Sequence, residues 1–420
     1  MRERTIAIHA GYIRDSQKTM TPPIYQSTAY AFDDTNEAAA LFNLEKFGNI
    51  YTRLTNPTVK LFEDKFCALE GGVGAVATAS GTAAIFYTIA NVASKGDNIL
   101  VAKQVYGGTS TMVNHTIKPF GIEARNFDVT SLDELENLID EKTKLILFEV
   151  LPNPALVVPD IEKIVEIGKK FNILVAADNT VATPILIKPI DWGVDITLHS
   201  ATKYAGGQGT SLGGIIIEGR SAKEKIVDNV RYKRFNEADE SYHGLVYTKV
   251  DHPPFTLRAR LALLRDFGAA MSPFNAWLLS LGLETLPLRM RQHSSSAKKI
   301  AQFLLSHPKV ERVNYPALKE SIYYPLVEKY FKEAMGSGLI SFVLKDPKDA
   351  YRVANSTKIF KIAANIADSR SIITHPASTT HQQLSKEELK AAGVEEGLIR
   401  LSIGLEDEED LIEDLAQALN

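Results

Sequence analysis

Two residues that could do chemistry follow directly on short apolar runs of the chain. Asp178 follows Ile173–Ala177 in the sequence Asp-Asn-Thr, and Lys203 ends the sequence His-Ser-Ala-Thr-Lys that follows Val194–Leu198. Such runs predict buried strands, and open α/β sheets bind ligands outside the carboxyl ends of their strands. A lysine amine and an acid placed there suit pyridoxal 5'-phosphate (PLP), the amine for its aldehyde and the acid for its pyridine nitrogen. The pair therefore predicts a PLP enzyme.

A candidate phosphate site accompanies this pair. The strand-like segment Ala75–Thr78 leads into Gly81 and Thr82, which open an apolar helical segment. Free backbone N–H groups at a helix start bind phosphate, and a glycine lets the phosphate approach closely. Ser200 and Thr202, just before the lysine, supply two hydroxyls that could donate to the same group. Alone, the glycine could mark a capped helix of any α/β fold, and Asp178 could be a turn or cap residue.

Two further segments carry side chains suited to a flat, phosphorylated ligand. Tyr106 follows the strand-like run Asn98–Ala102 and could stack on a ring, although tyrosines at strand ends often only pack. Tyr51 and Arg53 precede the first long helical segment of the α/β region. Arginine suits bidentate phosphate recognition and tyrosine adds a hydroxyl donor. An ordinary surface loop before a helix could have the same sequence, so this alternative stays open.

The elements that must position these residues alternate along the chain. Short β-rich runs alternate with helical segments such as 160–171, where Asp160 is the expected N-cap. Alternation of this kind predicts a mostly parallel central sheet with helices on both faces. The expected strands are Ala75–Thr78, Asn98–Ala102, Leu145–Val150, Ile173–Ala177, Val194–Leu198 and Gly214–Ile217.

The pattern divides the chain into three parts. Residues 1–50 are expected to form an N-terminal arm that contacts a neighbouring subunit, residues 51–268 a large PLP-binding domain, and residues 269–420 a smaller C-terminal α+β domain. Within the large domain, the polar segment 220–256 is interpreted as a long functional loop. In the smaller domain the order is two helices, near Asn275–Leu281 and from Leu286, followed by three strands. These strands are expected at Val310–Val313, Leu339–Leu344 and Leu398–Ile403.

The amino-acid composition limits the classes of molecule that the protein is expected to bind. The 420 residues are 45% hydrophobic and carry a net charge of −4 with acids and bases interspersed, so nothing favours nucleic acid or an anionic membrane. Small molecules are the expected partners. The one cysteine, Cys67, lies on the apolar face of a helical pattern, which predicts a core residue rather than a nucleophile. The chain shows no apolar leader and no long apolar run, so a cytoplasmic location is expected.

Two motif matches are rejected as sites, and no metal-ligand spacing is found. Residues 72–77 fit the dinucleotide pattern G-x-G-x-x-A, but they leave a helix and enter a strand, which is the reverse order. Residues 209–213 fit the hydrolase pattern G-x-S-x-G around Ser211, but a strand follows where a helix is needed, leaving a serine hydrolase as a remote alternative. His375 and His381 are interpreted as structural.

Several motifs taken together resemble one known family. These are YTRLTNPT, SGTAA, VYGGT, HSATK, THPASTTH and LIRLSIGLED, together with the Asp178-Asn179-Thr180 segment. The chain is similar, nearly from end to end, to the Cys/Met-metabolism family of fold-type I PLP enzymes. The family includes cystathionine γ-synthases, cystathionine and methionine γ-lyases, and homoserine-ester sulfhydrylases.

The resemblance implies roles for particular residues. Lys203 would hold PLP covalently, Asp178 would pair with the ring nitrogen and Tyr106 would stack on the ring, and these three form the expected catalytic set. The phosphate would be held by Gly81, Thr82, Ser200 and Thr202, with Tyr51 and Arg53 donated by a neighbouring subunit. Arg400 would bind the substrate carboxylate, assisted by Asn153 and Asn365. A shared site implies a homo-oligomer, expected to be a dimer of dimers.

The resemblance also implies an activity. The expected reaction is γ-replacement on O-acetyl-L-homoserine by sulfide or a thiol, giving homocysteine or methionine and acetate, in methionine biosynthesis. Cystathionine γ-synthase, O-succinylhomoserine sulfhydrylase and methionine γ-lyase activities are the alternatives, and a PLP-binding scaffold without turnover is another. The chain departs from the family pattern at residues 149–152, at Ala367 where glycine is usual, and at Gln208 where histidine is common. Gly108 replaces the cysteine typical of methionine γ-lyases, which disfavours that activity.

Overall fold

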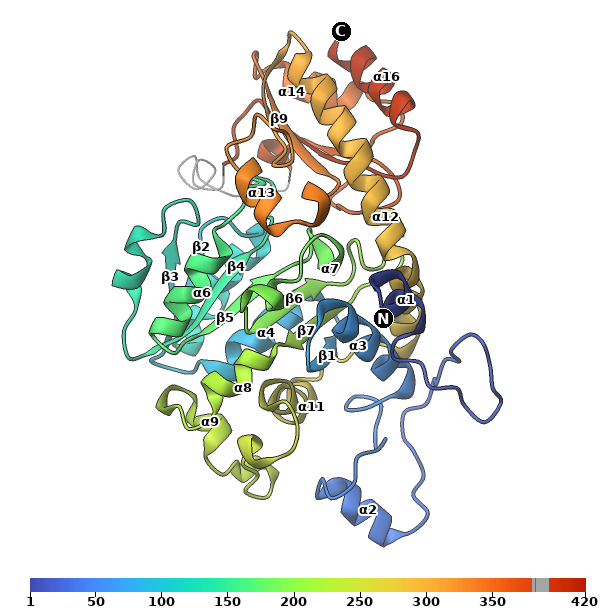
Figure 1. Cartoon of the computed structure of the whole chain (residues 1–420), viewed down its shortest axis with the longest axis vertical. Helices are drawn as coiled ribbons and strands as arrows, with labels where there is room; N and C mark the ends of the chain where they lie inside the picture. The colour runs from blue at the N-terminus through green and yellow to red at the C-terminus, as the bar shows by residue number, and fades with distance from the viewer. Residues whose placement is uncertain (380–381, 383–392) are drawn as a thin grey trace.

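The structure, a computed structural model, describes residues 1–379, 382 and 393–420. His381 lies outside the described residues. Two sheets dominate the molecule, and the long helix α12 (Pro273–Ser306) runs from one to the other (Figure 1). The expected boundary between residues 268 and 269 falls just before this helix.

The large sheet has seven strands in the order β1-β7-β6-β5-β4-β2-β3. All neighbouring pairs are parallel except β1 with β7 and β7 with β6, which are antiparallel. The strands are β1 (Gly74–Thr78), β2 (Asn98–Ala102), β3 (Glu123–Phe127), β4 (Thr143–Glu149), β5 (Leu174–Asp178), β6 (Ile196–Ser200) and β7 (Gly214–Glu218). The mostly parallel sheet is therefore confirmed, while β3 was not expected. β3 is an edge strand with the polar sequence Glu-Ala-Arg-Asn-Phe. Because an edge strand is partly exposed to solvent, it does not need the apolar run by which the other strands were predicted.

Helices cover both faces of this sheet. On one face lie α3 (Pro57–Glu70) and α6 (Ile161–Lys170), and on the other α4 (Gly81–Val92) and the short α5 (Gly107–Thr111). Asp160 caps α6 as expected, since its carboxylate accepts the Lys163 N–H at 3.4 Å. Cys67 is half-buried on α3 and packs against the core, and burial raises the pKa of its thiol to about 12. The remaining short helix α7 (Thr183–Leu186) follows β5.

The polar segment 220–256 is not a long loop, so that expectation is wrong. It folds into α8 (Arg220–Ile226), α9 (Lys233–Asn236) and the start of α10 (Pro254–Arg258), joined by 3-10 turns. A helical stretch then continues to α11 (Arg265–Phe267). Buried aromatic residues explain this folding, because Tyr232, Phe235, Tyr247 and Phe255 each join the core on the α4 face of the sheet.

The smaller domain has a five-stranded sheet in the order β10-β11-β12-β9-β8. Its elements are β8 (Val310–Asn314), α13 (Tyr324–Tyr330), β9 (Leu339–Leu344), α14 (Asp349–Ser356), β10 (Lys361–Ile362), β11 (Ile372–Thr374), β12 (Leu398–Ser402) and α16 (Glu408–Leu419). The three expected strands are present. The two expected helices are one, α12, which continues through Pro287 because apolar residues keep facing the core on both sides of the proline.

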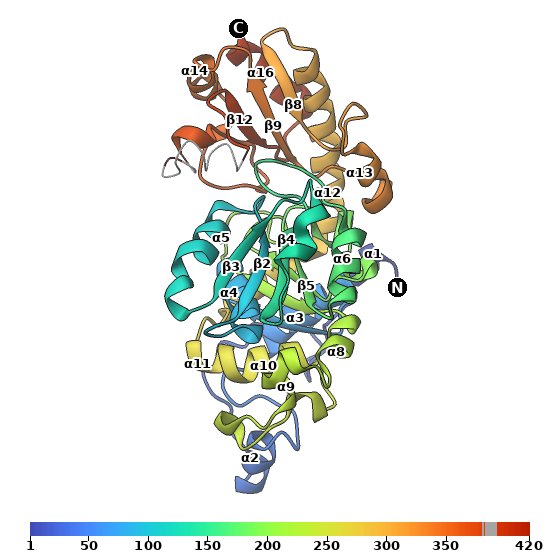
Figure 2. The same cartoon turned by 90° about the vertical axis from the view of Figure 1, so that its left-hand side faces the viewer.

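The N-terminal residues both pack on the large domain and extend beyond it. Helix α1 (Glu3–His9) lies against α3 and α12, where Lys65 donates to the Ile8 carbonyl at 3.2 Å and pairs with Glu284 at 2.9 Å. The following chain loops outward to α2 (Thr35–Phe42), at the end of the molecule opposite the smaller domain (Figures 1 and 2). Phe47 stacks on His252 there, with ring centroids 4.2 Å apart. Across residues 1–379 and 393–420 we found no helix with the length and apolar character needed to cross a membrane.

Candidate active site

The ends of two neighbouring strands bring Asp178 and the segment leading to Lys203 together. Strands β5 and β6 are parallel, with Asp178 opposite Leu198 in their register. Thr180 joins the two ends, because its N–H donates to the Asp178 carboxylate at 2.9 Å while its hydroxyl accepts the Ser200 N–H at 2.8 Å. One threonine thus fixes the acid relative to the turn that carries the lysine.

The Lys203 amine points across to the smaller domain. Its Nζ donates to the Asn365 side-chain oxygen at 2.7 Å. Burial, helped by the positive charge of Arg400, lowers the pKa of this amine. A lowered pKa favours the neutral amine, the form that can attack an aldehyde or accept a proton.

The start of α4 meets the Ser200 end of β6. Ser80 caps the helix, and its hydroxyl accepts the Ala83 N–H at 3.1 Å. A Cβ atom on Gly81 would lie 2.5 Å from the Ser200 Cβ, so only glycine allows this approach. Within the described part of the chain, the N–H groups of Gly81 and Thr82 have no acceptor, as expected of a helix start prepared for an anion.

Thr202 lies beside this corner, but its hydroxyl is already engaged. It accepts the Gly213 N–H at 3.1 Å and donates to the Gly213 carbonyl at 3.3 Å. The loop that contains Ser211 then enters β7, so the hydrolase motif leads into a strand, as expected from the sequence.

Arg400 faces the site from β12 of the smaller domain. Its guanidinium donates to the Asn153 side chain at 3.3 Å, the Asn365 carbonyl at 3.1 Å and the Thr374 hydroxyl at 3.0 Å. The side chain is buried, which lowers its pKa to about 10, and no described atom accepts its Nε–H. The three residues expected to bind the substrate carboxylate are therefore joined, and Thr374, which the sequence did not single out, joins them.

Tyr106 stands just before α5 with its side chain more than half exposed, at 55%. Its ring lies over Gly108, where an added Cβ would come within 2.5 Å of the ring. A side chain at position 108 would therefore displace this tyrosine.

Glu149 was missed as a site residue. It ends β4 opposite Asp178 in the register of β4 and β5, and its carboxylate accepts the Tyr106 N–H at 2.5 Å. Burial and the charge of Asp178 raise the pKa of Glu149 well above its usual range, and burial also raises the pKa of Asp178. The signal was available, because Glu149 follows an apolar run just as Asp178 does.

Tyr51 and Arg53 are not brought to this site within the chain. Arg53 lies over the Tyr51 ring at 5.2 Å, and both side chains are exposed. Among the described residues neither has a hydrogen bond to Ser200, Thr202 or Lys203. Their place in a cofactor site remains a prediction that requires a second chain.

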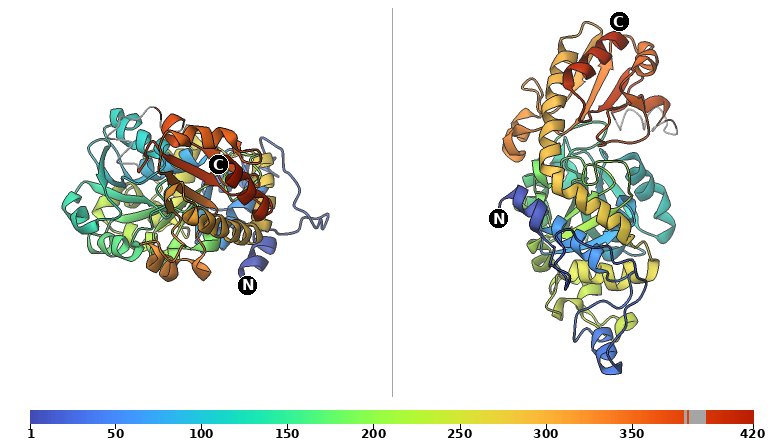
Figure 3. Two further views of the ribbon diagram at one scale, coloured as in Figure 1. Left: turned by 90° about the horizontal axis from the view of Figure 1, so that it is seen from above. Right: turned by 90° about the vertical axis from the view of Figure 1, so that its right-hand side faces the viewer.

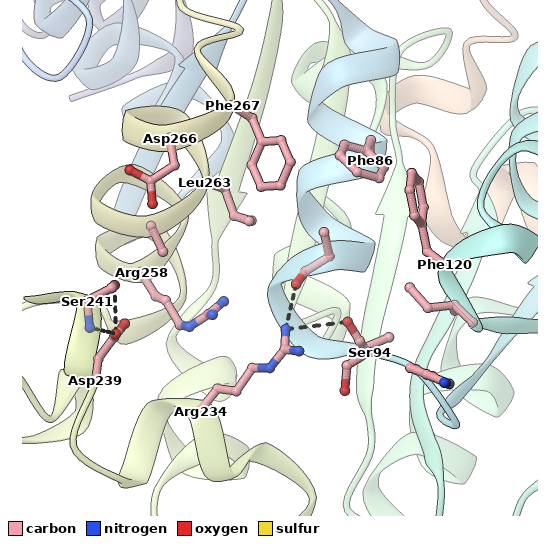
Figure 4. Close-up of a pocket in the computed structure, with 15 residues that line it drawn as sticks. Phe86, Ser94, Phe120, Arg234, Asp239, Ser241, Arg258, Leu263, Asp266 and Phe267 are labelled. Carbon is pink, nitrogen blue, oxygen red and sulfur yellow. Dashed lines mark hydrogen bonds between the residues drawn. The ribbon is translucent and has the colours of Figure 1, made fainter.

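A cavity of about 580 Å³ lies away from this site, along the C-terminal half of α4 (Figure 4). Phe86 and Phe120 line one side of it, Arg258 and Phe267 project from the helical stretch 254–267 on the other side, and Arg234 reaches in beside them. None of the expected site residues lines this cavity. In the described ranges no group of three or more His, Cys, Asp or Glu side chains could hold a metal ion.

The residues at the strand ends fit PLP by the chemistry of their donors. Lys203 offers an amine to an aldehyde, Asp178 offers a carboxylate to a ring N–H, and the start of α4 offers unpaired N–H groups to a phosphate. The fold and this site together define an α/β enzyme that uses PLP.

Comparison with known proteins agrees with this class. The chain belongs to the Cys/Met metabolism PLP-dependent enzyme family, whose model matches residues 4–420. It is 42% identical to an O-acetyl-L-homoserine sulfhydrylase of Leptospira meyeri, over 99% of this chain and 96% of that protein. It is 39% identical to a homocysteine synthase of Schizosaccharomyces pombe, over 99% and 97% of the two chains.

Solved structures show the same relationship. A crystal structure of a Campylobacter jejuni protein described as an O-acetylhomoserine (thiol)-lyase, with a pyridoxyl-lysine phosphate residue, has a TM-score of 0.98 at 50% identity and covers all of both chains. The MetB protein of Corynebacterium glutamicum has a TM-score of 0.85 at 32% identity, over 100% of this chain and 98% of that one. The fold class and the cofactor expected from the sequence are thereby confirmed.

Proposed function

We propose that this protein catalyses PLP-dependent γ-replacement on O-acetyl-L-homoserine, with sulfide or a thiol as the incoming group. The products are L-homocysteine or methionine, and acetate. The observation that carries the proposal is the approach of Lys203 and Arg400 to the same residue, Asn365, from the two domains. This arrangement suits an amino-acid substrate whose carboxylate is held while a proton moves at the adjacent carbon. Sulfhydrylases and homocysteine synthases among the relatives support the choice of reaction.

In this proposal the chain supplies orientation and proton transfer. Bound PLP supplies an electron sink for the bonds broken at the substrate. Arg400 binds the substrate carboxylate in a bidentate manner, and Asn153 keeps the guanidinium in place. Lys203 would take the proton from Cα and move a proton at Cβ so that acetate leaves from Cγ, and after sulfide or a thiol bonds to Cγ it would return the protons to Cβ and Cα. Asp178 would accept the N–H of the PLP ring, which would keep the electron sink effective.

The test is to assay purified protein with O-acetylhomoserine, with and without sulfide. Homocysteine that forms only with sulfide, from a protein whose visible absorption shows bound PLP, is the expected result. Release of 2-oxobutyrate without sulfide would replace the proposal with a γ-lyase, and product formed only with cysteine would indicate a cystathionine γ-synthase. Parallel reactions with the O-succinyl ester decide the acyl group.

We also propose that the active protein is a homo-oligomer, a dimer of dimers, that works in the cytoplasm. The exposed pair Tyr51 and Arg53 supports a shared site, because a hydroxyl and a cation suited to phosphate are exposed and, among the described residues, form no hydrogen bond to Ser200, Thr202 or Lys203. The outward loop that carries α2 supports contact with a second chain, since it exposes Ile13, Met20 and Phe42. A single cysteine suits a reducing compartment.

A further inference from the structure

Glu149 is a buried carboxylate that the proposed reaction does not use, yet it adjoins the acid that the reaction needs. β4 and β5 are parallel neighbours, and Glu149 stands opposite Asp178 in their register. Both side chains therefore leave the same face of the sheet. They line one small recess beneath α4, together with Ile85 and Thr109.

The Glu149 carboxyl lies next to two segments that carry expected site residues. It accepts the backbone N–H of Tyr106 at 2.5 Å, at the turn into α5. The backbone N–H of Asn153 lies near the same carboxyl and partly offsets the rise in its pKa. Tyr106 is the residue expected to stack on the ring, and Asn153 bonds to Arg400 at 3.3 Å. The Glu149 side chain thus holds the backbone of the residue that would stack on the ring, and it lies next to the backbone of a residue that would adjoin the substrate carboxylate.

The two neighbouring acids differ in what stabilises a negative charge. Thr180 donates its N–H to Asp178 at 2.9 Å, and this bond opposes the rise in the pKa of Asp178 that burial causes. In the described part of the chain Glu149 accepts one backbone N–H, from Tyr106, and burial and the charge of Asp178 both oppose its ionisation. Two adjacent buried carboxyls hold one negative charge far more easily than two. The charge therefore belongs on Asp178, where a protonated ring nitrogen would meet it.

We propose that Glu149 is a positioning residue that acts in its uncharged form. Through its hydrogen bond it holds the Tyr106 backbone, with the Asn153 backbone lying beside the same carboxyl, and it leaves the negative charge of the pair to Asp178. This inference rests on the proposed function, because it takes the Asp178 side of the site as the place of the PLP ring.

Three substitutions at position 149 test the length of the side chain separately from its charge. Glu149→Gln keeps the acceptor oxygen and removes the charge, Glu149→Asp keeps the charge and shortens the reach, and Glu149→Ala removes both. The dissociation constant of PLP is measured by titrating each apoprotein and following its intrinsic fluorescence, and the visible absorption maximum of bound PLP is recorded. We expect Glu149→Gln to stay within about twofold of the wild-type constant, and the Asp and Ala variants to bind PLP at least about tenfold more weakly with a shifted maximum.

Glu218→Ala is the matched control. Glu218 is also a buried strand-end carboxylate that accepts a backbone N–H, from Thr256 at 2.8 Å, but it lies at the other end of the sheet. This variant should lose thermal stability and keep the PLP constant and spectrum of the wild type.

Two results would overturn the inference. Wild-type affinity and spectrum in Glu149→Asp and Glu149→Ala would remove the positioning role, and a Glu149→Gln variant weaker than Glu149→Asp would show that the charge matters. If Glu149→Ala does not fold, the comparison of Gln with Asp still decides. Failure of the wild-type protein to bind PLP would instead refute the proposed function, and is seen before any variant is made.

Discussion

At the scale of single residues, the site depends on small side chains that hold larger ones. Thr180 connects Asp178 to the Ser200 backbone, and Asn365 accepts the Lys203 amine through its side chain while its carbonyl accepts Arg400. Neither threonine nor asparagine reacts in the proposed chemistry. Their bonds nevertheless fix where the acid, the amine and the guanidinium lie.

Asp178→Asn tests the role of the acid. An amide cannot keep the ring nitrogen protonated, but it keeps the size of the side chain and leaves the phosphate contacts intact. We expect PLP to remain bound while kcat for homocysteine formation falls by roughly 100-fold or more. The measurement combines absorbance of bound PLP with the steady-state rate. A variant that binds PLP and turns over at the wild-type rate would contradict this role.

At the scale of elements, the turn after Lys203 is anchored to α12. Arg289 is buried on that helix and donates to the carbonyls of Tyr204 at 2.7 Å, Ala205 at 3.2 Å and Gly282 at 2.7 Å. Gly207 leaves room for it, since a Cβ there would lie 2.2 Å from the guanidinium. The lysine turn is thus held by a helix that also carries the smaller domain.

Arg289→Leu should therefore lower the stability of the protein. The buried carbonyls of Tyr204 and Ala205 would lose this donor, while the Gly282 carbonyl keeps the bond from the Thr285 hydroxyl. Each unpaired group costs about 1–3 kcal/mol, so we expect the free energy of unfolding to fall by about 2 kcal/mol or more, measured by urea denaturation of the apoprotein. Arg291→Leu, which breaks the exposed ion pair with Glu333, is the control and should cost less than about 1 kcal/mol.

A second prediction at this scale concerns the junction of β7 with α10. The Glu218 carboxyl accepts the Thr256 N–H and hydroxyl, and burial raises its pKa from 4.5 to about 7. Between these values the folded chain holds a proton that the unfolded chain has released, so the free energy of unfolding falls as pH rises through this window. The full effect is about 3 kcal/mol, at about 1.4 kcal/mol per pKa unit.

Glu218→Gln cannot ionise, so the variant should gain stability relative to the wild type between about pH 5 and about pH 8. Urea unfolding of both proteins at these two values measures the gain. A difference that does not change with pH would show that Glu218 titrates normally in the folded protein.

The sequence predicted elements well where apolar runs are unbroken, and less well elsewhere. Asn98–Ala102 and Leu339–Leu344 match the observed strands residue for residue because both are buried along their length. α12 was expected as two helices, near Asn275–Leu281 and from Leu286, but it is one helix that also continues through Pro287, because its packing on both domains overrides the local preference of the proline. For the site, strand-end position singled out Asp178 and Lys203. The same signal at Glu149 was overlooked, and the role of Arg53 stays a prediction, because it involves a neighbouring chain.

At the scale of the whole molecule, a shared active site predicts complementation between inactive subunits. Lys203→Ala removes the amine from its own chain, and Arg53→Ala removes the cation that we propose is donated to the neighbour's phosphate. A mixed dimer of these two variants carries both defects in one site and none in the other. After dissociation and reassociation of an equal mixture, about a quarter of the sites should be intact, and homocysteine formation should recover accordingly.

The recovery is measured against each variant treated alone, and the wild-type protein taken through the same procedure sets the scale. An inactive mixture whose subunits have exchanged, as shown by mass spectrometry, would mean that Arg53 serves its own chain.

α12 gives the two halves of the molecule a mechanical connection. At 1.5 Å per residue, its 34 residues span up to about 50 Å (Figure 3). Near its start, Asn275 donates to the Leu212 carbonyl, and at its far end the helix packs against β8 and α16. A small rotation of so long a helix produces a large displacement at its far end. A rotation of about 2° about one end moves the other by nearly 2 Å, about the difference between a hydrogen bond and a broken one. We therefore expect substitutions in the smaller domain that lie far from the site to change the distance between Lys203 and Arg400 without contacting either residue.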